Sequence, residues 1–145
     1  MRIVLTLVIL SIFLCSCGAK KSAILSTSTN RTETSNDYEP FFDIVDYAPN
    51  KNYGLVGDKP IMVGEKSVSN QRRFISSLAG PNGELLIFHR RGSCCPYKSE
   101  KGFGGTAFVD VYEVMYDGLT EPILLYISFY DLEMLYIPKG FTKRK

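Results

Sequence analysis

Two adjacent cysteines, Cys94 and Cys95, are the side chains of this sequence best suited to do chemistry. They lie in the segment His89-Arg-Arg-Gly-Ser-Cys-Cys-Pro-Tyr97. In a regular strand, neighbouring side chains point to opposite faces, so both sulfurs could reach each other or one metal only in a turn. Gly92 and Pro96 bracket the pair and are typical of turns. We therefore expect a loop over residues 89–97.

Three roles are open for this pair. Two thiolates with His89 would make a three-ligand soft site for Zn²⁺ or Cu(I). A disulfide between neighbours is also open, but adjacent Cα atoms lie about 3.8 Å apart, below the usual range of about 4.4–6.8 Å. Such a bond would be strained and comparatively reducible, which suits a redox pair. Cys94 and Cys95 could instead be structural thiols buried as small hydrophobes, and this third role is the favoured interpretation.

Four arginines form two adjacent pairs, Arg72 with Arg73 and Arg90 with Arg91. Planar guanidinium groups bind carboxylate or phosphate with two parallel hydrogen bonds, so the pairs are candidates for an anion-binding site. Ordinary solvated charge, or pairing with Asp and Glu, is the alternative. If residues 90 and 91 belong to a strand, only one of them can face a given side.

The N-terminus has the order of a signal peptide. Arg2 precedes an apolar run from Ile3 to Leu14, which is shorter than the roughly 20 residues of a membrane span. The end of this run, Leu14-Cys-Ser-Cys17, resembles the lipobox of bacterial lipoproteins, in which the last cysteine carries the lipid. That resemblance implies a signal peptide over residues 1–16 and acylation (palmitate) of Cys17.

Lipidation would decide both location and cysteine chemistry. Two or more acyl chains hold a protein firmly on a membrane, whereas one chain binds reversibly. Gly18 is not the Asp that retains similar Gram-negative lipoproteins in the inner membrane, so we expect the outer membrane of the cell envelope. Cys94 and Cys95 would then be the only free thiols, in an oxidising compartment.

The rest of the chain divides into a tether and one domain. Seven of the ten residues from Ser26 to Ser35 are Ser or Thr, so residues 17–37 are expected to be a disordered tether. Residues 38–145 are then a single small α+β domain. It begins with a strap, residues 38–50, whose apolar side chains dock on the core or bind a partner as a peptide would. The docking residues we expect are Phe41, Phe42, Ile44 and Val45.

The patterns downstream of Tyr53 predict a small antiparallel sheet of three to five strands covered by one helix. The helix has about ten residues, with Ser69 as its N-cap, and ends at Gly80. Phe74 and Leu78, with either Gln71 or Ile75, form its buried face. The expected strands are residues 59–63 at an edge, because Pro60 cannot donate to a ladder; 85–90; 106–116 in the centre; and 122–130. Residues 134–138 cover one end of the sheet.

A wider resemblance covers about residues 53–142. It is carried by Gln71-Arg-Arg-Phe74, Gly80-Pro-Asn-Gly-Glu84, Arg91-Gly-Ser-Cys-Cys-Pro-Tyr97 and Val111-Tyr-Glu-Val114. Together these look like an uncharacterised family of small bacterial lipoproteins with an Arg-Gly-Ser-Cys-Cys element. Its members are sometimes labelled 2-dehydro-3-deoxyphosphooctonate aldolase, so the resemblance implies that activity as one alternative.

Size and charge then narrow the function. An aldolase of this type is expected to use a (β/α)₈ barrel of about 250 residues, far longer than the matching segment. The 17 Lys and Arg nearly balance the 15 Asp and Glu, so no strong field attracts nucleic acid. We expect a non-enzymatic envelope module without a cofactor, which binds a protein, peptide or glycan. A thiol redox or soft-metal protein using Cys94 and Cys95 is the alternative.

Overall fold

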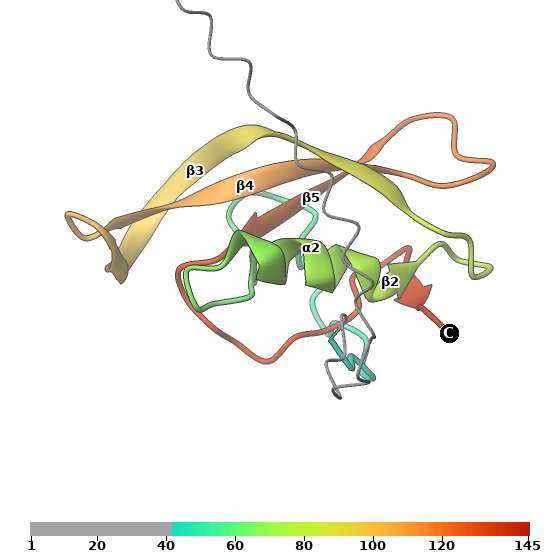
Figure 1. Cartoon of the computed structure of the whole chain (residues 1–145), viewed down its shortest axis with the longest axis horizontal. Helices are drawn as coiled ribbons and strands as arrows, with labels where there is room; N and C mark the ends of the chain where they lie inside the picture. The colour runs from blue at the N-terminus through green and yellow to red at the C-terminus, as the bar shows by residue number, and fades with distance from the viewer. Residues whose placement is uncertain (1–41) are drawn as a thin grey trace, which may run out of the picture. The chain divides into compact units, whose positions relative to one another are not determined.

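A long twisted ribbon of two strands is the main element of the fold (Figure 1). The computed structural model describes residues 42–145. Strand β3 (Ile87–Phe103) pairs antiparallel with β4 (Thr106–Met115), which pairs antiparallel with β5 (Ile123–Ser128). The short strand β1 (Ile61–Met62) runs parallel to β5 and completes the sheet in the order β1-β5-β4-β3. Strands β2 (Leu78–Ala79) and β6 (Thr142–Lys143) form a separate antiparallel pair.

Alternation along the central strand β4 gives the sheet two buried faces. Tyr112 and Val114 point to the side covered by the helix, whereas Val109 and Val111 point to the opposite side, called the outer face below. All four are buried. The prediction of a small, mostly antiparallel α+β fold with a central strand at residues 106–116 and an edge strand near Pro60 is confirmed.

Helix α2 (Val68–Ser76) lies along one face of the sheet (Figure 1). Phe74 and Ile75 are fully buried against the sheet core. The predicted N-cap at Ser69 is wrong. Ser67 caps the helix, because its backbone is extended and its hydroxyl accepts from the Asn70 amide. Leu78 lies in β2 rather than in the helix.

The N-terminal strap docks in part as expected. Ile44 is buried, and the Phe42 ring lies beneath the Arg73 guanidinium at 4.6 Å. The Phe42 amide also donates to the Ser77 hydroxyl at 2.7 Å. Val45 is exposed, contrary to expectation, and Phe41 lies outside the described residues. Residues 1–16, Cys17 and the tether also lie outside them.

Strand β3 differs most from the prediction. Residues 89–97 were expected to form a loop, but β3 runs through them without ending. Register shifts between Arg90 and Gly92, and between Cys94 and Tyr97, take up extra residues as β-bulges. β3 is an edge strand, and bulges with Pro96 make such an edge a poor template for pairing with another chain. The turn residues therefore mark bulges rather than a loop.

Within residues 42–145, no helix is long and apolar enough to cross a membrane.

Candidate functional site

A disulfide joins Cys94 and Cys95 within strand β3. The β-bulge between Cys94 and Tyr97 places an extra residue in β3, and Cys95 adopts a left-handed backbone with φ of 53°. This departure from regular pleating lets neighbouring side chains meet without a turn. The disulfide replaces the free buried thiols that the sequence favoured. Both cysteines are only half-buried.

The disulfide packs under the backbone of the segment before β1. A Cβ atom added to Gly57 would overlap the Cys95 sulfur and lie 3.5 Å from the Tyr126 ring. Beneath the pair, Val109 is the cross-strand partner of Cys94 and is fully buried. The disulfide is therefore held between a glycine backbone and the outer face of the sheet.

Two surface hollows meet at Cys95. One, of about 580 Å³, is mainly apolar, with Asp58 at its rim; its walls include Pro60, Met62, Pro96 and Tyr97. The other, of about 440 Å³, has the disulfide, Val111, Leu124 and Tyr126 in its walls, with Arg91 at one side.

Burial raises the pKa of Tyr97 to about 12, and its hydroxyl donates to Asp131 at 3.0 Å. Tyr97 thus stays a neutral donor fixed beside the disulfide.

A charged cluster lies next to these hollows on the outer face. His89 Nε2 lies 2.9 Å from one Glu113 oxygen, and Arg91 Nη1 lies 3.4 Å from the other. His89 was a candidate metal ligand with the two cysteines, but the structure pairs it with Glu113, and bonded sulfurs are not thiolate ligands. Residues 42–145 contain no group of three His, Cys, Asp or Glu side chains placed to hold a metal.

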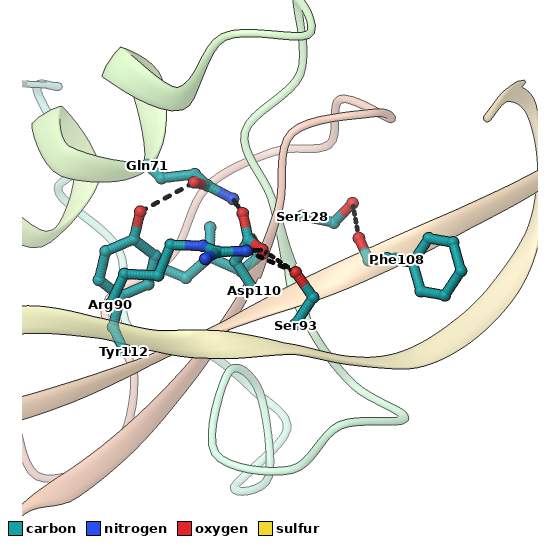
Figure 2. A network of polar contacts seen from close by, with 8 residues as sticks. Gln71, Arg90, Ser93, Phe108, Asp110, Tyr112 and Ser128 are labelled. Atoms are coloured by element: carbon teal, nitrogen blue, oxygen red, sulfur yellow. Dashed lines mark hydrogen bonds and ion pairs between the residues drawn. The ribbon is translucent and has the colours of Figure 1, made fainter. Parts of the chain in front are cut away.

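A buried polar network occupies the other face of the same strands (Figure 2). The Asp110 carboxylate, 5% exposed, accepts from Arg90 Nη2 at 2.7 Å, from the Ser93 hydroxyl at 2.6 Å and from Gln71 Nε2 at 3.0 Å. Gln71 reaches down from α2 and also accepts from the Tyr112 hydroxyl at 2.9 Å. Each buried polar group among these therefore has a partner.

This network controls the charge of Asp110. Burial alone would raise the pKa of its carboxyl, but hydrogen bonds from Arg90, Ser93 and Gln71 outweigh burial and hold the pKa below its ordinary value. Burial raises the pKa of the Tyr112 phenol, an effect opposed by the nearby guanidinium groups of Arg72 and Arg90. The site therefore holds a buried carboxylate beside a neutral tyrosine.

The structure divides the four candidate arginines. Arg72 and Arg90 lie near the same Tyr112 hydroxyl, on the helix side of the sheet. Arg73 instead packs over Phe42 and donates to Asn70. Arg91 faces the outer side with Glu113. Only Arg72 and Arg90 therefore remain candidates for a joint anion-binding site.

Sequence reasoning missed the network itself. Asp110 sits in the alternating run Phe108-Val-Asp-Val-Tyr-Glu-Val114, where the other positions of its face are aromatic or aliphatic. Gln71 likewise falls on the apolar face of α2 and is fully buried. A charged or amide side chain on a buried face requires a hydrogen-bond partner. This requirement is the sequence signal that could have paired Asp110 with Gln71. No comparable signal marks Gly57.

Comparison with known proteins adds no relative. The chain matches no family model, no curated protein and no solved structure.

We predict that Asp110→Asn removes part of the acid sensitivity of the fold. A carboxyl whose pKa is lowered by folding contributes stability above its unfolded pKa, and that contribution is lost as pH falls through the folded pKa. Near pH 7 the variant should lose about 2–4 kcal/mol of unfolding free energy, because Arg90 loses its charged partner. Urea unfolding from pH 7 to pH 2 measures this.

The exposed Asp117→Asn is the matched control and should stay within about 0.5 kcal/mol of the parent. A parent and an Asp110→Asn variant with parallel pH profiles below about pH 4 would contradict the role given to this carboxylate.

A second prediction concerns the packing of the disulfide. Gly57→Ala should lower the unfolding free energy by about 1–3 kcal/mol, because its Cβ overlaps the Cys95 sulfur. Gly92→Ala is the control in the same strand as the disulfide, since its Cβ would meet no atom within 4 Å. Thermal unfolding under non-reducing conditions measures both, and equal melting temperatures would rule out the close packing of Gly57 on Cys95.

Proposed function

We propose that this chain is a lipid-anchored bacterial envelope protein that acts as a non-enzymatic binding module. Cys17 carries the lipid, and the outer face of β3 contacts a protein, peptide or glycan partner. The observation that carries the proposal is the half-exposed disulfide between two hollows, with His89, Arg91 and Glu113 beside it.

The chemistry of this face suits recognition of another molecule. Binding sites combine mainly apolar walls with a few fixed polar groups, and both hollows have this composition. The paired charges of Arg91 and Glu113 fix orientation at one end. The disulfide, pinned between Gly57 and the sheet, keeps the walls in place before a partner arrives, which lowers the ordering cost of binding.

The anchor would make weak contacts effective. A disordered tether over residues 18–37, as the sequence predicts, would have a root-mean-square span of roughly 25 Å and would keep the domain close to the lipid surface. Confinement of this kind raises the effective concentration of membrane-bound partners. The proposed outer-membrane location follows from the residue after Cys17, which is Gly18 rather than Asp.

The disulfide itself favours thiol redox as a second candidate function. A dithiol donor of the envelope would attack one sulfur through its thiolate and form a mixed disulfide, and the donor's second thiolate would resolve that bond. Cys94 and Cys95 then gain two electrons and two protons, and the donor is oxidised to its disulfide. Half-exposure of both cysteines gives access for such an attack.

A photo-crosslinking amino acid at position 91 tests the binding function in intact envelopes. We expect one recurrent conjugate, because Arg91 is exposed beside the outer-face hollow. The same group at the exposed Glu121, in the turn between β4 and β5, is the control and should give none. Cys17→Ser should abolish the conjugate together with palmitate incorporation, since the tether has no apolar span.

Equal conjugates from positions 91 and 121 would contradict a partner surface on β3. Palmitate incorporation into the Cys17→Ser chain would contradict the anchor. Loss of the conjugate when only Cys94 and Cys95 are replaced by alanine, with rapid turnover of a dithiol substrate by the parent, would favour the redox candidate. The purified protein should show no aldolase turnover of 2-dehydro-3-deoxyoctonate phosphates.

A further inference from the structure

A groove of about 570 Å³ opens on the helix side of the sheet, at the first residue of α2. It lies on the opposite face of β3 from the disulfide, so its occupancy is independent of the binding function proposed above. Its volume falls within the range of small-molecule sites. Its lining residues are Val68, Arg90, Ser93, Phe108, Asp110, Phe129 and Tyr130.

The walls of the groove are mainly apolar and partly uncovered. Val68 is 44% exposed and Phe108 is 47% exposed. The rings of Phe129 and Tyr130 stack with 4.6 Å between their centroids, and both residues line the groove. An apolar ligand segment would remove this surface from water, which is favourable in proportion to the area covered.

One end of the groove carries a fixed guanidinium. Arg90 donates from a single nitrogen, Nη2, to both Asp110 and Ser93, and its side chain is 47% exposed. An arginine has five N–H donors, and within residues 42–145 no acceptor takes those on Nη1 and Nε of Arg90, which leaves them for a ligand. Asp110 offsets the charge of Arg90 but engages only its Nη2, and the other Asp110 oxygen accepts from Gln71. The net positive charge on this side of the sheet therefore comes from Arg72.

The network gives Arg90 more order than a surface arginine has. Burying Asp110 together with Gln71 and Tyr112 costs desolvation that apolar side chains would avoid, so stability alone does not account for these residues. Their effect is to hold the Arg90 guanidinium at the polar end of an apolar groove. Preorganised donors of this kind are the usual basis of specific anion recognition.

We propose that this groove binds a small amphipathic carboxylate. The carboxylate accepts hydrogen bonds from Arg90, and the hydrocarbon body lies against Phe108, Phe129 and Tyr130. Arg72, one helical turn from Val68 and close to the same Tyr112 hydroxyl as Arg90, adds positive charge on this side of the sheet.

Introducing a negative or a positive charge at Val68 tests the groove without disturbing the polar network. The probe is decanoate labelled with ¹³C at its carboxylate, added to the full chain in phosphatidylcholine nanodiscs, with empty nanodiscs as the partition blank. Val68→Asp should weaken decanoate binding about 10-fold or more, and Val68→Lys should strengthen it. Val68→Asp should still fold, because an acidic residue in the first turn of a helix is favourable.

Arg90→Gln and Arg91→Gln form a matched pair on opposite faces of β3. Loss of decanoate binding in the first variant and retention in the second, with no comparable binding of decyltrimethylammonium, is the expected result. Equal decanoate affinity in Val68→Asp and Val68→Lys would overturn the proposal. Equal affinity of the parent for decanoate and decyltrimethylammonium would also overturn it, because the groove would then be an unselective apolar surface.

Discussion

The structure depends on one buried carboxylate and the donors that keep it charged. Asp110 lies in the middle of the central strand, where a carboxylate without hydrogen-bond partners would strongly destabilise the fold. Gln71 from α2 and Arg90 and Ser93 from β3 meet this requirement, so three elements distant in sequence converge on one group (Figure 2). The same contacts fix the helix on the sheet and the edge strand in its register.

The segment from His89 to Tyr97 therefore contributes side chains to both faces of the sheet. Arg90 and Ser93 point to the helix side and complete the network, whereas Arg91 and the disulfide belong to the outer face. The bulge at Gly92 and the left-handed Cys95 allow this division within an unbroken strand. The proposed binding surface on the outer face and the proposed anion site on the helix side can thus share one short segment without sharing side chains.

Much of the fold could be predicted from the sequence because its signals are local. Alternation located the central strand at residues 106–116, and Pro60 placed the short strand β1 at an edge. The helix was found, but its N-cap was missed by two residues, since Ser67 and Ser69 are equally good capping residues and only backbone geometry separates them. The loop expected at residues 89–97 was wrong because Gly and Pro are common in bulges as well as in turns.

The polar network joins residues from three elements, and a single sequence does not show which buried polar side chains become neighbours.

We propose that a lipid-anchored domain presents an edge strand braced by a disulfide. Intact-mass spectrometry of the protein extracted from native membranes, alkylated before and after reduction, tests both the anchor and the disulfide. We expect a chain that begins at an acylated Cys17, takes up no alkyl group before reduction and takes up two after it, at Cys94 and Cys95. An unacylated chain, or alkylation of both cysteines without reductant, would contradict it.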